Sequence, residues 1–253
     1  MDTMEQRRNA IVDFINEKGN ITFAQLESRF PNVSPMTLRT DLKFLDEAKK
    51  IVRIHGGAKS VELVLGTDDY IGRRNVRNVE EKESIARKVV PLIKPNTTIF
   101  LDSGSTTKAL AKIWPDQANF IFTSSIECVM ELSKLQHPTV FIPGGELNKY
   151  SMSVCGVRAI ESVKEVNFDL AILGVTSYST DVGFSCGVLM ESYLKQAVLQ
   201  QSAEKIILMD SSKIGTKSTF HICQMEEIDM VISDQNVLMD FQMECEKSGV
   251  HLL

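Results

Sequence analysis

The sequence lacks the features of several protein classes. No apolar run in its 253 residues approaches the ~20 residues of a membrane-spanning helix, so we expect no membrane contact. Residues 1–8 contain no apolar secretory core, and the five cysteines form no CxxC pair, so we expect a cytoplasmic protein with reduced thiols. The four histidines show no HxH or HExxH spacing, and no GK[ST] loop is present. We therefore expect no metal ion and no cofactor.

The chain has the composition of an ordinary globular protein, with 43% hydrophobic and 24% charged residues. Its net charge of −5 argues weakly against nucleic-acid binding, but the charge is unevenly distributed. The first 60 residues carry a small positive excess, and the remaining residues carry the net negative charge. This pattern fits a DNA-binding module joined to a separate domain. Because the module is only weakly basic, we expect a homodimer or homotetramer that multiplies the DNA contacts.

Residues 34–45 predict a short capped helix with one apolar face and one basic, hydroxyl-rich face. Ser34 is a good N-cap, and Pro35 lies at the first helical position, where its missing N–H costs nothing. Leu38, Leu42 and Leu45 recur with the period of a buried stripe. The outward face has the chemistry to enter a DNA major groove. Its candidate DNA-binding residues are Ser34, Met36, Thr37, Arg39, Thr40 and Lys43. Met36 either contacts a thymine methyl group or covers the core.

The flanking segments complete a predicted winged helix-turn-helix domain over residues 1–60. A first helix with apolar residues at 10, 11, 14 and 15 ends at Gly19, and Thr22 caps a second helix. Strands at 51–54 and 58–65 form a hairpin, the wing. Arg53 and His55 are further DNA-binding candidates there, although His55 either contacts a DNA phosphate or only shapes the wing. A lone amphipathic helix is usually just a solvated surface helix, but the whole motif in order favours DNA binding.

Residues 61–79 are polar and predict a linker, whereas residues 80–253 alternate between helical and strand patterns. This alternation predicts an α/β domain with a mostly parallel sheet covered on both faces. The candidate strands are 98–101, 119–122, 139–142, 170–175, 206–209, 230–233 and 250–252. The candidate helices are 80–93, 106–114, 126–135, 190–203 and 237–247.

Small hydroxyl residues and glycines follow five of these strands. Ligands of open α/β sheets bind beyond the carboxyl ends of the strands, and glycine-containing loops before helices bind anions. We therefore predict an effector site for a phosphorylated sugar. Its candidates are Asp102, Ser103, Gly104, Ser105, Thr106, Thr107, Thr123, Ser124, Ser125, Gly144, Gly145, Thr176, Glu191 and Lys213.

Each of these residues also has an ordinary structural interpretation. Serine, threonine, glycine and aspartate cap helices in any strand-to-helix turn. Lys213 is either a phosphate ligand or a solvated surface lysine, and Glu191 on a predicted helix is exposed by default. The five loops together favour an effector site, in which Asp102 or Glu191 accepts hydrogen bonds from sugar hydroxyls.

A series of short motifs extends over nearly the whole chain: Arg7-Arg8, Ile11, Gly19, Leu26, Val33-Ser34, Thr37 to Leu42, Leu45, Arg53 to Ala58, Glu81-Lys82, Asp102 to Thr107, Gly144-Gly145, Gly156, Phe168-Asp169 and Asp210 to Lys213. In these motifs the chain resembles the DeoR-type family of bacterial transcriptional regulators. It implies an N-terminal winged helix-turn-helix and a C-terminal sensor similar to the ribose-5-phosphate isomerase and CoA-transferase fold. It also implies repression of an operon for carbohydrate uptake or breakdown, relieved by a phosphorylated sugar.

The sequence departs from the family pattern at three positions. The family usually has two arginines where this chain has Arg39-Thr40, and its second loop usually has an asparagine where Ser124 stands. Its phosphate loop is commonly Asp-x-Gly-Thr-Thr, whereas here Ser105 is either an extra residue or fills the first threonine position. None of these changes removes a hydrogen-bond donor from the predicted anion site.

Three hypotheses follow from the sequence. The main one is a repressor that binds double-stranded operator DNA and is not an enzyme. The second is a sugar-phosphate isomerase-like enzyme with Glu191 as its base, although Gly174 to Ser177 lack the acidic residues that such a site needs. The third is a DNA-binding protein that senses no ligand. Turnover of ribose 5-phosphate and thermal shifts with sugar phosphates distinguish them.

Overall fold

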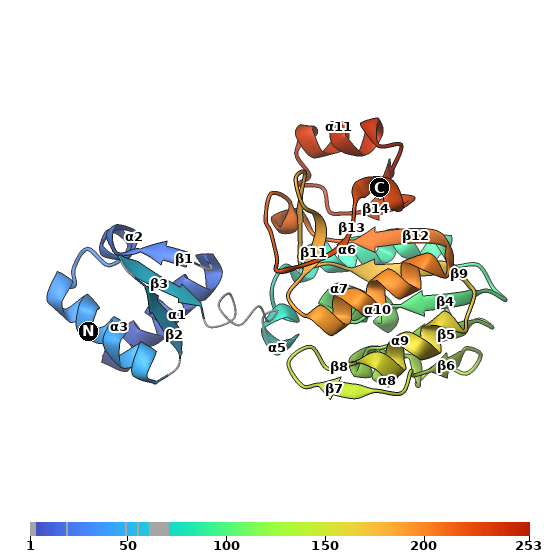
Figure 1. Ribbon diagram of the computed structural model, residues 1–253, viewed down its shortest axis with the longest axis horizontal. Coiled ribbons are helices and arrows are strands. Elements are labelled where there is room, and N and C mark those ends of the chain that lie inside the picture. The colour runs from blue at the N-terminus through green and yellow to red at the C-terminus, as the bar shows by residue number, and fades with distance from the viewer. Residues whose placement is uncertain (1–3, 19, 49, 55, 61–70) are drawn as a thin grey trace. The chain divides into compact units, whose positions relative to one another are not determined.

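The computed structural model describes residues 4–18, 20–48, 50–54, 56–60 and 71–253 (Figure 1). The chain divides into two compact units, Met1–Thr67 (unit 1) and Asp68–Leu253 (unit 2). Unit 1 contains α1 (Met4–Lys18), β1 (Asn20–Thr22), α2 (Phe23–Arg29), α3 (Pro35–Glu47), β2 (Ile51–Ile54) and β3 (Gly57–Ser60). This order confirms the predicted helix-turn-helix with its hairpin. The predictions for Gly19, His55 and strand residues 61–65 lie outside the described residues.

Local side-chain chemistry sets the boundaries of unit 1. The Thr22 hydroxyl accepts a hydrogen bond from the Gln25 amide N–H, and the Gln25 side chain accepts one from the Thr22 N–H, so α2 begins with a capping box. The strands pair antiparallel in the order β1-β3-β2. Gly57 lies where a Cβ atom would be 2.0 Å from the Ile21 carbonyl oxygen, so this close pairing requires glycine.

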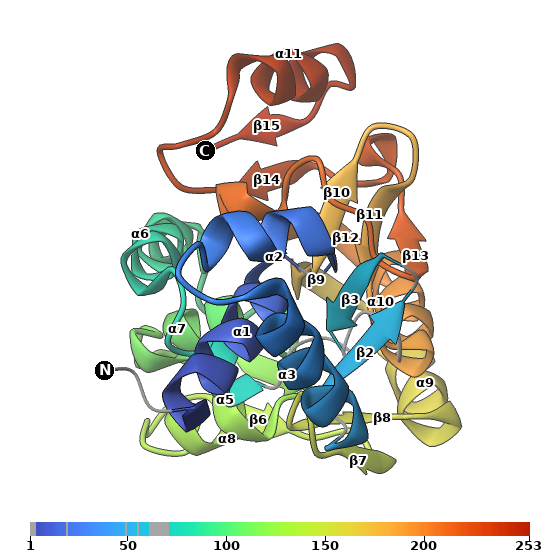
Figure 2. The same ribbon diagram turned by 90° about the vertical axis from the view of Figure 1, so that its left-hand side faces the viewer.

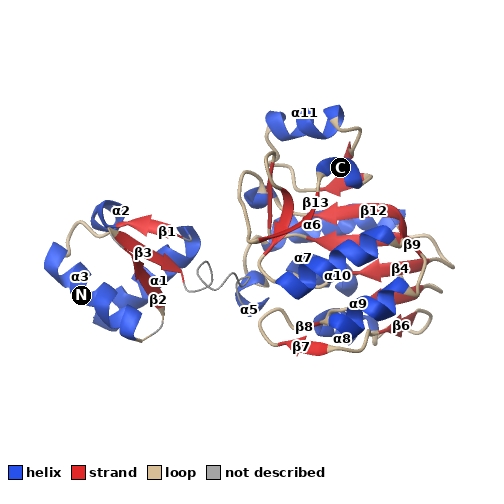
Figure 3. Cartoon of the chain, in the orientation of Figure 1, coloured by secondary structure: helices blue, strands red, loops and turns tan. Residues whose placement is uncertain are grey.

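Unit 2 is built on a seven-stranded parallel sheet with the order β15-β14-β12-β9-β4-β5-β6. Its strands are β4 (Thr98–Leu101), β5 (Phe120–Thr123), β6 (Thr139–Phe141), β9 (Phe168–Gly174), β12 (Ser202–Leu208), β14 (Met230–Ile232) and β15 (His251–Leu252). Figure 3 shows these strands alternating with helices. The predicted α/β class with a parallel sheet is therefore confirmed.

Helices cover both faces of this sheet: Figure 2 shows α6, α7 and α8 on one side and α9 and α10 on the other. The helices are α6 (Val79–Val89), α7 (Ser105–Lys112), α8 (Ile126–Leu132), α9 (Val157–Lys164), α10 (Leu189–Gln200) and α11 (Met239–Lys247), with the 3-10 helix η1 (Val90–Leu92) after α6. Ile99 and Leu101 of β4 pack with α6, α7 and α8, whereas Phe100 packs with α9 and α10. The alternation of side chains along each strand thus separates two apolar layers.

Several elements were not predicted. A hairpin of β7 (Glu146–Asn148) and β8 (Ser153–Cys155) follows β6, and an antiparallel sheet joins β10 (Ser177–Ser179), β11 (Gly183–Cys186) and β13 (Phe220–Cys223). The sequence analysis also missed α9. Two more 3-10 helices, η2 (Ser211–Lys213) and η3 (Met225–Glu227), precede and follow β13. The hairpin and the second sheet extend from the carboxyl ends of the parallel strands, where the predicted site lies.

The second half of the predicted linker differs from the expectation. Residues 71–74 form the short helix α5 (Ile71–Arg74), and Ile71 is 3% exposed. The Ile71 N–H donates to the Tyr150 carbonyl oxygen at 2.8 Å, so this segment packs on unit 2. The sequence of this segment resembled a linker because it is polar. The residues that accept its hydrogen bonds lie far away in the sequence, so no local pattern revealed them.

Two expectations from the composition concern membrane and metal contacts. Among the described helices, none has the length and apolar character to cross a bilayer. Within the same residues, no group of three His, Cys, Asp or Glu side chains is arranged to hold a metal ion. All five cysteines are buried free thiols. Burial raises the pKa of the Cys128 thiol to about 12, which makes it unreactive at neutral pH.

Candidate functional site

The helix α3 presents the predicted DNA-binding face. The Ser34 hydroxyl caps it by accepting the Thr37 amide N–H at 3.1 Å, and Pro35 is its first residue. Its three leucines, Leu38, Leu42 and Leu45, are at most 3% exposed. The other predicted residues lie outward: Ser34, Met36, Arg39, Thr40, Lys43 and, on β2, Arg53 are exposed, and Thr37 is half-buried.

Contacts within unit 1 hold parts of this face in place. The Arg39 guanidinium carbon lies 4.9 Å from the centre of the Phe23 ring, and the Thr40 hydroxyl donates to the Met36 carbonyl oxygen at 3.0 Å. Met36 itself is 72% exposed, so it does not cover the core. Lys43 Nζ lies 3.9 Å from Glu47 Oε1, and both side chains are 67% exposed. Cations, hydroxyls and a methionine thus form one accessible surface.

Asp41 on the opposite side of α3 was quoted in the sequence motif but given no role. It is 1% exposed, and its two carboxylate oxygens accept hydrogen bonds from Arg7 Nε at 2.7 Å and Arg8 Nε at 2.8 Å. The hydrogen bond to Asp41 raises the pKa of Arg7. Arg8 also lies over the Phe44 ring, 3.7 Å from its centre. These contacts fix α1 against α3, which sets the position of the exposed face.

In unit 2, the chain order reverses at the centre of the sheet, between β4 and β9. From β4 the chain builds one half through β5 and β6, and then returns to build the other half from β9. Such a switch point is where ligands bind in open α/β sheets. Asp102 follows β4 there, and its Oδ2 accepts the Gly174 N–H at 3.0 Å.

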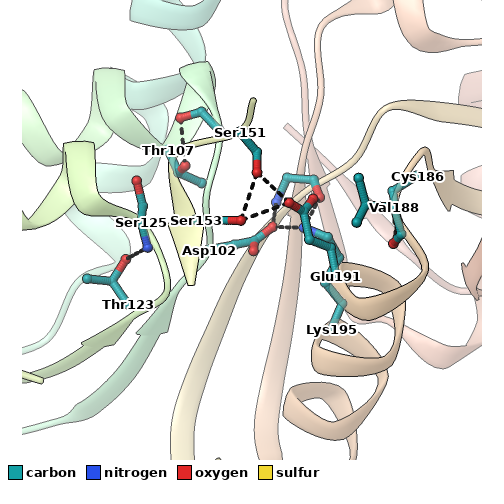
Figure 4. Close-up of polar contacts among 12 residues, drawn as sticks. Asp102, Thr107, Thr123, Ser125, Ser151, Ser153, Cys186, Val188, Glu191 and Lys195 are labelled. Atoms are coloured by element: carbon teal, nitrogen blue, oxygen red, sulfur yellow. Dashed lines mark hydrogen bonds and ion pairs between the residues drawn. The ribbon is translucent and has the colours of Figure 1, made fainter. Parts of the chain in front are cut away.

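Lys195 on α10 forms an ion pair with Asp102 that the sequence analysis missed. Figure 4 shows the two side chains meeting beside α10. The side chain of Lys195 is 4% exposed and that of Asp102 is 2% exposed. Lys195 Nζ also donates to the Gly174 carbonyl oxygen at 3.1 Å. Burial alone would lower the pKa of Lys195, but the charges of Asp102 and Glu191, the nearby Cys186 and the hydrogen bond to Asp102 together outweigh it, and the pKa is raised. The pair ties α10 to the ends of β4 and β9.

The predicted anion loop after Asp102 is compact. Gly104 has φ +139°, a conformation that favours glycine, and it leads directly into α7. The Thr107 hydroxyl turns back to the Gly104 carbonyl oxygen at 3.0 Å. Ser103, Ser105 and Thr107 are buried, and Thr106 is half-buried. A Cβ atom at Gly104 would lie 3.3 Å from Arg74 Nη2, so the Arg74 guanidinium lies beside the loop.

The loop after β5 contains the three other predicted hydroxyls. The Thr123 hydroxyl accepts the Ser125 N–H at 3.1 Å, and the Ser125 hydroxyl caps α8 by accepting the Cys128 N–H at 3.1 Å. Both therefore serve the turn itself. The Ser124 hydroxyl is different: it is buried, and among the described residues it has no hydrogen-bond partner. A ligand hydroxyl or phosphate oxygen would satisfy it.

Glu191 is buried rather than exposed, because the unpredicted β7–β8 hairpin covers it. It is 4% exposed, and its Oε1 accepts hydrogen bonds from Ser151 Oγ at 2.6 Å and Ser153 Oγ at 2.8 Å (Figure 4). Asn148 Nδ2 lies 3.4 Å from the same oxygen. Three short polar side chains before α9 were the signal for this cluster, but their partner is about 40 residues away.

Cations gather near the anion loop. Lys82 on α6 is 6% exposed and donates to the carbonyl oxygens of Arg74, at 2.6 Å, and Arg77. Its pKa is lowered to about 8, mainly by burial; the attraction of Asp210 opposes this effect, and repulsion from Lys213, Arg74 and Arg77 adds to it. Lys213 is half-buried in η2, so it is not an ordinary solvated lysine. Lys82 and Arg74 were not among the predicted site residues.

The remaining predicted residues have mainly structural surroundings. Gly145 lies at the start of the β7–β8 hairpin, where a Cβ atom would be 2.4 Å from the Cys155 carbonyl oxygen, and Gly144 precedes it. Thr176 precedes β10, and its N–H donates to the Ser185 carbonyl oxygen at 3.1 Å. The assignment of these three residues to the effector site stays a prediction.

A cavity of about 250 Å³ lies between α6 and α7 and reaches the anion loop at Ser105. Asn75, Lys82 and Lys108 line its polar side, and Val79 and Ile113 line its apolar side. Asn75 Oδ1 is buried and, within the described residues, without a hydrogen-bond partner. The cavity therefore brings cations and an unsatisfied acceptor next to the loop that the sequence identifies as an anion site.

Comparisons with known proteins cover both units. A family model of the DeoR-like helix-turn-helix domain matches residues 7–64, and a model of the DeoR C-terminal sensor domain matches residues 77–235. The HTH-type transcriptional regulator GolR of Listeria innocua is 31% identical, over 92% of this chain and 91% of its own. The glycerol-3-phosphate regulon repressor of Escherichia coli is 29% identical, over 90% of each chain.

Unit 2 is also similar to parts of solved structures. Ribose 5-phosphate isomerase A from Methanocaldococcus jannaschii is 19% identical, with a TM-score of 0.40 over 54% of this chain and 55% of its own. The eIF2B delta subunit from Chaetomium thermophilum is 15% identical, with a TM-score of 0.45 over 63% of this chain and 58% of its own. The two family models match the two units of the chain separately, and the chain belongs to the DeoR family of transcriptional regulators.

Proposed function

We propose that this protein is a transcriptional repressor of a carbohydrate uptake or breakdown operon, with its DNA affinity controlled by a phosphorylated sugar bound in unit 2. One observation carries the proposal: the same chain contains an exposed basic face on α3, in unit 1, and an anion loop beside cationic side chains, in unit 2. Relatives include repressors named for glycerol-3-phosphate and for a lactose phosphotransferase system, which supports this class of operon. It acts in the cytoplasm, where the operator DNA lies.

The DNA-binding part rests on α3. Its Arg39, Thr40 and Lys43 reach solvent together, while its leucines anchor it to the core. Helix-turn-helix proteins bind as two-fold dimers, with one recognition helix in each half-site. We infer the same here, with a dimer or a tetramer formed from it, because unit 1 alone has too little positive charge for tight binding.

Replacing Arg39 with alanine tests this surface. We expect operator binding to weaken by about 1–3 kcal/mol, because a base or phosphate contact is lost while the buried face of α3 is untouched. Fluorescence anisotropy with a labelled duplex from the chain's own promoter region measures the change. Lys18→Ala on α1 removes the same charge from an exposed position and serves as the control. Equal affinities of R39A and K18A would remove Arg39 from the interface.

The effector part rests on the loop residues and the cations. A phosphate near Ser105 would meet the α7 N-terminus, Arg74 and Lys82, and hydroxyls near Ser124 would satisfy its orphaned side chain. Thermal shift with fructose 6-phosphate, glycerol 3-phosphate, ribose 5-phosphate and inorganic phosphate tests this. We expect a sugar phosphate to stabilise unit 2 more than inorganic phosphate does. Enzymatic turnover of any of the three phosphate esters would favour an enzyme instead.

The lowered pKa of Lys82 predicts a pH dependence. Below a pKa of about 8, Lys82 is charged and attracts a phosphate dianion; above it, the ammonium loses its proton. Affinity for the best-binding sugar phosphate is therefore expected to fall as the pH rises from about 7 to about 9, by at most about tenfold per pH unit for one proton. Calorimetric titrations measure this. Lys82→Arg stays charged throughout, so an equal pH dependence in K82R would show that another group is responsible.

A further inference from the structure

The strap, which we define as residues 71–78, contacts three separate elements: the turn of the β7–β8 hairpin, helix α8 and the segment after β12. The Ile71 N–H donates to the Tyr150 carbonyl oxygen at 2.8 Å, beside the β7–β8 hairpin. Asn75 Nδ2 donates to Glu127 Oε1 on α8 at 3.0 Å. Asn78 Nδ2 donates to Asp210 Oδ1 after β12 at 3.0 Å. A displacement of any of these three elements would therefore disturb a hydrogen bond of the strap.

The strap also lies beside the anion loop itself, through Arg74 next to Gly104. Its carbonyl oxygens at Arg74 and Arg77 accept hydrogen bonds from the buried Lys82 ammonium. Lys82 donates two of its three protons to these carbonyl oxygens, and Arg74 belongs to the strap, so a phosphate bound at Lys82 and Arg74 would contact the strap directly. Occupation of the anion site therefore changes the interactions that hold the strap in its seated position.

Two features make the seated position of the strap depend on a few side-chain contacts. Asn78 has φ +48°, a left-handed conformation that costs an ordinary residue energy and is held here by the side-chain bonds to Asp210 and to Ser212 Oγ at 3.2 Å. Asn75 has a satisfied amide nitrogen, but its buried Oδ1 lacks a partner among the described residues. A partly satisfied buried network is weakly held compared with a complete one.

We propose that the strap is the switch that transmits effector binding to unit 1, with Asn78 as its principal positioning residue. The proposal rests on the proposed function and deepens it by naming the regulatory element. The seated strap corresponds to the DNA-binding state, and a phosphate bound at Lys82 and Arg74 shifts the strap from that position. Only ten residues, 61–70, separate Ile71 from the last residue of β3, so a displaced strap changes the attachment of unit 1.

The variant Asn78→Gly tests the proposal directly. Glycine adopts the same left-handed backbone without strain but removes the side-chain bonds to Asp210 and Ser212. The matched control is Asn96→Gly, because Asn96 also has a left-handed backbone, φ +60°, but lies in the turn before β4, outside the strap. Fluorescence anisotropy with the full chain and a duplex selected from random sequences measures operator affinity, without ligand and with fructose 6-phosphate or glycerol 3-phosphate.

Without any ligand, N78G is expected to bind the operator at least about fivefold more weakly than N96G and the wild type, the lower end of usual allosteric coupling. Its remaining response to the sugar phosphates is expected to be smaller than that of the wild type. Equal ligand-free operator affinities of N78G and N96G would overturn the strap proposal. Failure of the proposed function would be seen in the wild type itself. The wild type would then bind no duplex, or its operator affinity would change with neither fructose 6-phosphate nor glycerol 3-phosphate.

Discussion

Replacing Lys195 with methionine is expected to lower the free energy of unfolding of unit 2 by about 3–5 kcal/mol, the usual cost of removing one partner from a buried ion pair. Methionine keeps the aliphatic length of the side chain but leaves the Asp102 carboxylate 2% exposed without a cation. Urea denaturation followed by tryptophan fluorescence measures this change. Trp114 is the one tryptophan of the chain, is buried in unit 2, and therefore reports on that unit alone.

The control for this prediction is Lys217→Met. Lys217 also pairs with an aspartate, Asp181, but both side chains are more than half exposed. An exposed pair contributes about 0–1 kcal/mol, so K217M should unfold almost as the wild type does. The double variant D102N/K195M should recover part of the loss, because an asparagine oxygen still accepts the Gly174 N–H without burying a charge. Equal stabilities of K195M and K217M would contradict the assigned role of the buried pair.

Lys195 also shows where sequence reasoning reaches its limit. The parallel strands were predictable because apolar runs such as 98–101 and 206–209 are local signals bounded by turn residues. The same holds for α3, whose cap, proline and leucine stripe all lie within twelve residues. Lys195 lies on α10 and its partner is 93 residues away, so no local pattern distinguishes it from a solvated lysine.

The candidate site divides in the same way. The loops after β4 and β5 were found because strand-turn-helix order places them at one edge of the sheet. The short strands β7 and β8 have three residues each, too few to show a period of two, so the partners of Glu191 were missed. Arg74 was missed because residues 71–78 look polar in sequence, while the partners of Asn75 and Asn78 in this segment come from α8 and from the loop after β12. Lys82 was missed because its partners are main-chain carbonyl oxygens, which leave no sequence signal.

Replacing Asp41 with alanine is expected to separate α1 from α3 and to abolish tight operator binding. The substitution leaves the Arg7 and Arg8 side chains without their shared carboxylate; these side chains are 21% and 13% exposed, respectively. We expect unit 1 to lose about 2–3 kcal/mol, less than for a fully buried pair because both arginines still reach water. Thermal unfolding followed by circular dichroism should show unit 1 melting earlier, while Trp114 fluorescence, which reports on unit 2, is unchanged.

The matched control is Asp13→Ala, which removes the same charge from an exposed position on α1. D13A and D41A change the net charge of unit 1 equally, so a purely electrostatic effect on DNA binding would be the same in both. Only D41A removes the link between the helix that carries Arg7 and the helix that carries Arg39. If D41A melts and binds the operator as D13A does, the orientation of α3 depends on its leucine stripe alone, and the buried carboxylate has no part in presenting the DNA-binding face.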